Sequence, residues 1–166
     1  MELVKICVSR GYPAMAADIM NVPLRSCSVD AVICIAVLHH ISTHERRLQA
    51  IRQLLRIVKS GGSVFLQAWA FEQAPTSRRK CETQDVMVPW CLARRFVSKE
   101  PEALAAAHGV VDEARNVVVF NRYCYVYKEG ELLALFEEAA AGTCALEVLE
   151  QAFDNSNWCL CVRVTK

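Results

Sequence analysis

The stretch VDAVICIAVLHHISTHERRLQAIRQLLRIVKSGGSVFLQAWAFEQ, residues 29 to 73, decides the fold. It begins with an apolar run from Asp30 through Ala36, which is typical of a strand in a parallel sheet with helices on both faces. Ser42 to Val58 predicts a helix, and Ser63 to Ala70 predicts the next strand. A strand, helix, strand unit of this kind predicts two parallel strands joined by a crossover, and therefore an α/β fold.

The helix of this unit has recognisable ends. Ser42 and Glu45 form a capping box at its start, and Gly61 and Gly62 end it. The sequence therefore predicts a core helix packed on the sheet. Its apolar positions recur at helical spacing and form one stripe: Leu48, Ile51, Leu54, Leu55 and Val58.

Upstream of this unit the sequence predicts a short helix and a short strand. Glu2 to Arg10 suits a helix that ends at Gly11, because glycine readily takes the left-handed conformation that closes a helix. Ala14 to Ala17 suits a short strand, and Asp18 follows it directly.

Downstream, residues 71–115 are expected to form an irregular insertion over the site, with an alanine-rich helix from Glu102 to His108. Long insertions between regular elements are often functional. The last predicted elements are a strand, a helix and a closing hairpin around a polar turn: Asn116 to Tyr127, Glu129 to Ala140, and Ala145 to Phe153 with Trp158 to Val164 around Asp154-Asn155-Ser156-Asn157.

Length and composition favour a single intracellular domain over residues 1–166. The net charge is +1, so any contact with RNA is local or shared with a partner. The longest apolar run, Ala31 to Leu38, is too short to span a membrane, and residues 1–12 carry no secretory pattern. The nine cysteines include no CxxC pair, so we predict reduced thiols and no metal site. The expected location is the cytoplasm, with the nucleus as a further one.

Several motifs are more specific than the strand, helix, strand unit itself. They are HHISTHERR and AWAFEQ within residues 29 to 73, TQDVMVPW at 83 to 90, FNRYCYVYKEGEL at 120 to 132, and DNSNWCL at 154 to 160. Together they resemble the family that methylates the carboxymethyl group of wobble 5-carboxymethyluridine in tRNA, a domain also fused to an AlkB-type dioxygenase in animals. The likeness covers nearly the whole chain.

The resemblance implies a Rossmann-like class I methyltransferase sheet in the order 3-2-1-4-5-7-6, with S-adenosylmethionine at the carboxyl ends of the strands. On that pattern Ala14 to Ala17 is strand 3, Ala31 to Ala36 is strand 4, Ser63 to Ala70 is strand 5, and the hairpin supplies strands 6 and 7. Strands 1 and 2 are missing, together with the glycine-rich turn that lets the backbone approach the cofactor. We therefore expect an N-terminally truncated chain.

The resemblance also implies five cofactor-binding residues. Asp18, followed by Ile19, would accept a hydrogen bond from the adenine amino group, although a turn or helix N-cap is the alternative for Asp18. Ile35, Ala36 and Val37 lie where strand 4 passes the methionine and adenine moieties, and core packing is compatible with the same positions.

Histidines and arginines follow the end of that strand. His39 and His40 would orient the substrate carboxylate, or contact phosphate when protonated; structural roles are the alternative. Arg46 and Arg47 are cations at a helix start, where the dipole prefers anions, which indicates either a bound anion or a solvated helix face.

Other site residues come from the specific motifs. The resemblance implies catalytic roles for Trp69, Arg122 and Tyr123, and substrate-binding roles for Arg46, Arg47, Gln73, Asp85, Trp90 and Tyr125. Aromatic stacking and hydrogen bonds to base edges are the expected interactions, with core packing as the competing explanation. The family pattern has a tyrosine and a histidine where this chain has Cys124 and Tyr125, which puts substrate specificity in question.

The implied reaction is methyl transfer from S-adenosylmethionine to the carboxylate of a wobble uridine in a tRNA anticodon loop. The implied partner is a small zinc-containing activator protein along the Ala14–Ala17 edge strand. Two alternatives stay open. A catalytically inactive fragment or paralogue that acts as a protein-interaction module is favoured by the missing glycine-rich turn. A generic small-molecule methyltransferase explains the strand motifs but not QDVMVPW.

Overall fold

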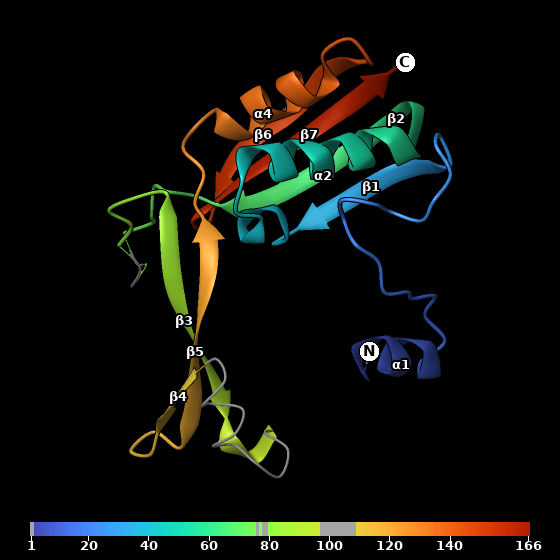
Figure 1. Cartoon of the computed structure of the whole chain (residues 1–166). Helices are drawn as coiled ribbons and strands as arrows, with labels where there is room; N and C mark the ends of the chain where they lie inside the picture. The colour runs from blue at the N-terminus through green and yellow to red at the C-terminus, as the bar shows by residue number, and fades with distance from the viewer. Residues whose placement is uncertain (1, 76, 78–79, 97–108) are drawn as a thin grey trace.

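The computed structural model describes residues 2–75, 77, 80–96 and 109–166, and these residues form two sheets (Figure 1). The main sheet has the strand order β1-β2-β7-β6: β1 (Val29–Ile35), β2 (Val58–Trp69), β7 (Asn157–Thr165) and β6 (Ala145–Asp154). The second sheet has the order β3-β5-β4: β3 (Asp85–Ala93), β5 (Val117–Tyr125) and β4 (Gly109–Asp112). The described helices are α1 (Glu2–Ser9), α2 (His44–Ile57) and α4 (Glu131–Ala140), with 3₁₀ turns η1 (Leu38–His40) and η2 (Arg94–Phe96). Among them we find none with the length and hydropathy of a membrane span.

The main sheet confirms the predicted α/β class. β1 pairs in parallel with β2, β7 runs antiparallel to β2, and β6 forms a hairpin with β7. Asn155 and Ser156 in the hairpin turn have φ angles of 46° and 64°, as a tight two-residue turn requires. The strand order β1-β2-β7-β6 matches the predicted 4-5-7-6 part of a class I methyltransferase sheet.

Helix α2 forms as predicted, but its cap lies one residue later than expected. Thr43, rather than Ser42, is the N-cap, and its hydroxyl accepts a hydrogen bond from the backbone N–H of Arg46 at 3.3 Å. The predicted apolar stripe from Leu48 to Leu55 is buried.

The helix also ends earlier than the glycine pair suggested. β2 begins at Val58, directly after α2, and residues 59–62 form an irregularity in which the pairing shifts from Val29–Val58 to Ala31–Ser63. Gly62 lies here because a Cβ atom would come within 2.5 Å of the Asp30 carbonyl oxygen. The two glycines therefore shape the start of the strand and do not end the helix.

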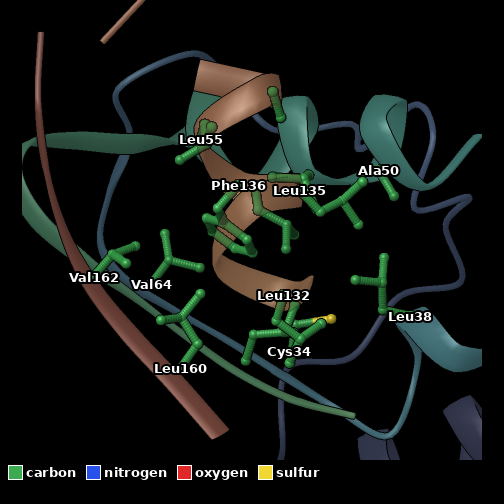
Figure 2. Packing of buried hydrophobic residues seen from close by; sticks show 14 of the residues in the cluster. Cys34, Leu38, Ala50, Leu55, Val64, Leu132, Leu135, Phe136, Leu160 and Val162 are labelled. Atoms are coloured by element: carbon green, nitrogen blue, oxygen red, sulfur yellow. The ribbon is translucent and has the colours of Figure 1, made fainter. Parts of the chain in front are cut away.

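The core lies between one face of the main sheet and the pair of helices α2 and α4 (Figures 1 and 2). Phe136 from α4 is fully buried in the same core cluster as Leu66 and Val162 of the sheet. On the opposite face of β1, Ile33 and Ile35 are 71% and 51% exposed. The prediction that helices cover both faces is therefore wrong for β1, since the described helices α2 and α4 pack on a single face.

The strand predicted at Ala14–Ala17 is not formed. These residues belong to no ladder, and the isolated backbone bridge that follows them joins Asp18 to Asn21. A strand needs a paired neighbour to satisfy its backbone N–H and C=O groups, and the described ladder of β1 runs to β2 alone. The helix predicted at the amino end is confirmed as α1, and Gly11 after it has a φ of +81°.

Strands β3, β5 and β4 form an arm that projects from the main sheet (Figure 1). β3 pairs with β5 without interruption from Asp85–Tyr125 to Ala93–Val117. The prediction that residues 71–115 are irregular is therefore wrong for residues 85–93 and 109–112, which form β3 and β4. Pro89 is tolerated because β3 is an edge strand, where one missing N–H donor costs little. The helix predicted at Glu102–His108 lies outside the described residues.

Candidate active site

The carboxyl ends of β1 and β2 meet the carboxyl end of β5 around η1. After β1, Ala36 takes a positive φ of 57°, and its N–H donates to the Gln67 carbonyl at 3.0 Å. This turn delivers the chain to Leu38, which is fully buried, and then to the two histidines. The structure thus brings His39 and His40 to the strand ends, as predicted.

His39 is a buried positioning residue. Its side chain is 1% exposed, and its ring stacks on Trp69 with centroids 4.6 Å apart and planes at 23°. The backbone N–H of Trp69 points at Nδ1 of His39 across 3.3 Å. Because an N–H can only donate, this Nδ1 is the unprotonated nitrogen and the ring proton sits on Nε2. His39 therefore fixes the orientation of Trp69.

His40 is exposed and has the opposite tautomer. Its Nδ1 lies 3.2 Å from the Tyr123 carbonyl oxygen, which can only accept, so the Nδ1–H donates. The Cys124 sulfur is 3.6 Å from the same nitrogen. Nε2 is then the nitrogen that can accept a proton or contact a ligand. A histidine held in this way can offer either a lone pair or a positive charge to a neighbouring group.

Tyr123 and Asp85 form the third part of the cluster. The Tyr123 hydroxyl donates to the Asp85 carboxylate and also lies 3.2 Å from the Ser42 carbonyl oxygen. Burial, and then the hydrogen bond and charge of Asp85, raise the pKa of Tyr123 above its ordinary value of 10.0. The phenol therefore stays protonated and acts as a hydrogen-bond donor at neutral pH.

The two arginines at the start of α2 have different environments. Arg47 is buried, donates to the carbonyl oxygens of Ile41 and Ser42 at 3.1 and 3.0 Å, and lies 3.8 Å above the Tyr125 ring. The expectation that Arg47 contacts substrate is therefore corrected: its guanidinium is taken up by protein groups. Arg46 is exposed, and its Nε contacts the Met20 sulfur at 3.3 Å.

Tyr125 belongs to a half-buried hydrogen-bond network beside Arg47. Its hydroxyl donates to Glu131 at 2.5 Å, and Gln84 Nε2 donates to that hydroxyl and to Glu131 at 3.0 and 2.6 Å. These bonds tie β5 to the start of α4. Gln84 and Glu131 were missed in the sequence because polar residues beside a strand and a helix start are usually solvated.

Gln73 and Trp90 do not join the cluster. The Gln73 amide donates to the Ala70 carbonyl at 2.6 Å and its oxygen accepts from the Ser77 hydroxyl at 2.8 Å, so the side chain builds a turn. Trp90 lies on β3 opposite Phe120, toward the far half of the arm. Arg122, on β5, places its guanidinium 5.5 Å from the Trp90 ring centroid.

The five predicted cofactor residues lie in two segments, residues 18–19 and 35–37, and their role in cofactor binding stays a prediction. Ile35 and Val37 present exposed apolar side chains after β1, flanking the turn at Ala36. The Asp18 carboxylate accepts from the Met20 N–H at 2.9 Å, and Ile19 packs on the core. Exposed apolar side chains such as Ile35 and Val37 are of the kind that contacts the adenine and thioether of S-adenosylmethionine, but none of the six glycines forms a G-x-G turn for the amino-acid end.

Known proteins resemble the chain in sequence over most of its length. The family model described as "Methyltransferase domain" matches residues 2–66. The chain is 36% identical over 162 residues to tRNA (carboxymethyluridine(34)-5-O)-methyltransferase of Schizosaccharomyces pombe, covering 95% of this chain and 66% of that protein. The chain belongs to the tRNA carboxymethyluridine methyltransferase family. This family member spans 66% of the length of the yeast relative, and 22% and 30% of the next two curated relatives.

Solved structures confirm the class I methyltransferase fold of this family member. An S-adenosylmethionine-dependent methyltransferase from Clostridium acetobutylicum matches with a TM-score of 0.61 at 11% identity, covering 98% of this chain and 69% of that one. A complex of the Haloferax volcanii Trm112 methyltransferase activator with a methyltransferase matches with a TM-score of 0.52 at 13% identity, covering 99% and 69%. At these identities the likeness concerns the fold alone.

Proposed function

We propose that this chain takes part in methyl transfer from S-adenosylmethionine to the carboxylate of 5-carboxymethyluridine at the wobble position of tRNA. The supporting observation is the cluster at the strand ends. There an exposed His40 with a directed Nε2 stands beside Tyr123, which donates to Asp85, and beside Trp69, which is held by His39. The names of the sequence relatives supply the substrate class.

The reaction asks for alignment more than for acid–base chemistry. A carboxylate oxygen is already nucleophilic at neutral pH, and S-adenosylmethionine, when bound, supplies an electrophilic methyl group. The protein's task is to orient the carboxylate and exclude water from it. Protonated His40 offers a cation to that carboxylate, and the flat face of Trp69 offers a surface for the uracil ring.

A partner protein belongs to the same proposal. We propose that a small zinc-containing activator protein binds the chain in the cytoplasm, in line with the activator complex found among the structural neighbours. We do not propose that the activator protein pairs with a strand at residues 14–17, since those residues form no strand.

The first test is calorimetric titration of the chain with S-adenosylhomocysteine, followed by a tritiated-methyl transfer assay on tRNA that carries 5-carboxymethyluridine. Micromolar binding together with incorporation of label is the expected result. His40→Gln should lower the rate by about 10²-fold through misalignment of the carboxylate. His44→Gln is the matched control, because His44 is also exposed and pairs with Glu138 outside the cluster.

A second function is favoured by the absence of a G-x-G turn among the six glycines. In that case the chain is a non-catalytic interaction module of the same fold. Lack of S-adenosylhomocysteine binding and of label incorporation, in the presence of the activator protein as well, would reject the enzymatic proposal in favour of this one. Transfer to small carboxylic acids but not to tRNA would instead indicate a small-molecule methyltransferase.

A further inference from the structure

One face of the β3–β5 arm carries a cation and two aromatic rings. In the antiparallel ladder Trp90 lies opposite Phe120, and Val88 lies opposite Arg122. Directly opposed residues and those two apart share a face of a sheet. Trp90, Phe120 and Arg122 therefore point to the same side, which we call the Trp90 face.

The contacts on the Trp90 face leave it available to a ligand. The rings of Trp90 and Phe120 are 5.7 Å apart and tilted by 36°, and Trp90 remains 40% exposed. The Arg122 guanidinium stands 5.5 Å from the Trp90 ring and is exposed. In the described part of the chain no ion pair engages Arg122. Without a carboxylate partner, its charge is directed to solvent.

This face leads directly to the candidate active site. Cys124 follows Arg122 by two residues on the same face, and its sulfur contacts His40 at 3.6 Å. Because a strand advances about 3.3 Å per residue, Arg122 lies about 7 Å and Phe120 with Trp90 about 13 Å beyond Cys124. The spacing between successive side chains on this face is comparable to the separation of neighbouring nucleotides in an unstacked RNA strand.

The side chains of the Trp90 face suit single-stranded RNA. Aromatic side chains stack on unpaired bases of any sequence, and arginine contacts phosphate and stacks as well. The opposite face of the arm differs, because Met87 and Val110 there are 60% and 69% exposed and carry no charge. Charge complementarity with RNA therefore favours the Trp90 face.

We infer that the Trp90 face holds the unpaired nucleotides beside the target uridine of an anticodon loop. The target base lies at His40 and Trp69, Arg122 contacts an adjoining phosphate, and a neighbouring base stacks on Trp90. The inference rests on the proposed function for the identity of the RNA. It assigns Trp90 to a neighbouring nucleotide, whereas the sequence predicted that Trp90 contacts the modified base itself.

The test is fluorescence anisotropy of the full chain with a labelled anticodon stem-loop that contains 5-carboxymethyluridine. Trp90→Ala should weaken binding by roughly 5- to 150-fold, and Trp90→Phe should restore most of it. Arg122→Gln should reduce the slope of log K against log salt by about 0.7, the value for one phosphate contact in a single strand. Met87→Ala on the opposite face, and Arg115→Gln in the turn between β4 and β5, are the matched controls. Circular dichroism confirms that each variant is folded.

The outcomes separate this inference from the proposed function. If the stem-loop binds with the expected variant pattern but no methyl group is transferred, the face is supported and the catalytic proposal fails. If methyl transfer proceeds while Trp90→Ala and Arg122→Gln leave affinity and KM at the level of the controls, the inference is overturned. Absence of stem-loop binding by the wild-type chain, or equal binding of a fully paired RNA duplex, also overturns it.

Discussion

Arg47→Ala is expected to lower the free energy of unfolding by about 3–5 kcal/mol, whereas Arg46→Ala should change it by less than about 0.5 kcal/mol. The two residues are adjacent, have the same charge, and were expected to act together. The Arg47 guanidinium, however, is buried and bonded to two carbonyl oxygens, and Arg46 is exposed. The pair therefore compares a charge inside the fold with one on its surface.

The magnitude follows from the contacts of Arg47. Each charge-assisted hydrogen bond contributes about 1.5–3 kcal/mol, and a shielded cation over a ring contributes about 1–2 kcal/mol. Rehydration of the Ile41 and Ser42 carbonyls after the substitution offsets part of this sum, which leaves the range given above. For a chain of this size it corresponds to a fall of roughly 6–20 °C in Tm.

Urea denaturation followed by circular dichroism measures the effect, with Arg47→Lys as an intermediate. Lysine keeps the charge but lacks the planar guanidinium, which lies over the Tyr125 ring while its Nη1 donates to both carbonyls, so it should recover less than half of the loss. Equal midpoints for Arg47→Ala and Arg46→Ala would refute the reasoning. So would a variant of Arg47 that is fully stable but impaired only in anion binding, because that pattern belongs to a ligand-contacting residue.

Three further predictions concern single side chains. Thr43→Ala should cost about 1 kcal/mol by urea denaturation, since Thr43 caps α2, whereas Ser42→Ala should be nearly neutral. Tyr125 should ionise near pH 12 in a spectrophotometric titration, because burial and then its hydrogen bond to a carboxylate raise its pKa to about 12. The pKa of Tyr125 is higher in the folded than in the unfolded chain. The stabilisation that the protonated hydroxyl gives the fold is therefore fully present below pH 10 and is lost as the pH rises through 12. A Tyr125→Phe variant whose free energy of unfolding depends on pH in the same way as that of the wild type would contradict this. Cys34 should react with iodoacetamide far more slowly than the exposed Cys91 at pH 8, because burial raises the pKa of Cys34 to about 11; equal rates by mass spectrometry would count against the buried placement.

Much of the main sheet could be predicted because its signals are local. The apolar run of β1, the stripe of α2 and the polar turn before β7 each indicate one element without knowledge of its neighbours. The wrong strand at residues 14–17 shows the limit of such signals. Four apolar residues are compatible with an extended conformation, but only a neighbouring strand makes that conformation a strand.

The arm could not be predicted for a related reason. The TQDVMVPW stretch alternates weakly and contains Pro89, which argues against a central strand. Its strand character comes from pairing with the aromatic β5, and the paired residues lie 24 to 40 positions apart in sequence, from Ala93–Val117 to Asp85–Tyr125. The same pairing decides where Trp90 lies, so its separation from Trp69 was not visible in the sequence.

The candidate site was predictable in position but not in detail. Strand ends in an α/β sheet gather functional residues, and His39, His40, Trp69 and Tyr123 do meet there. The different tautomers of the two histidines depend on the Trp69 backbone N–H of β2 and the Tyr123 carbonyl of β5. The burial of Arg47 likewise depends on a tyrosine ring on β5, and only the folded chain brings them together.

The uncovered face of the main sheet, together with the exposed helix α1 and the projecting arm, has a thermodynamic consequence. The chain exposes 10446 Å², whereas a monomer of 18.6 kDa is expected to expose about 8,200 Å². Unfolding therefore uncovers less new apolar surface than is usual for the length, and the heat-capacity increment should fall below about 2 kcal/mol/K. A smaller increment flattens the curve of stability against temperature. Warming and cooling away from the optimum should therefore each cost this protein less than they cost a chain of the same length with both faces of its sheet covered.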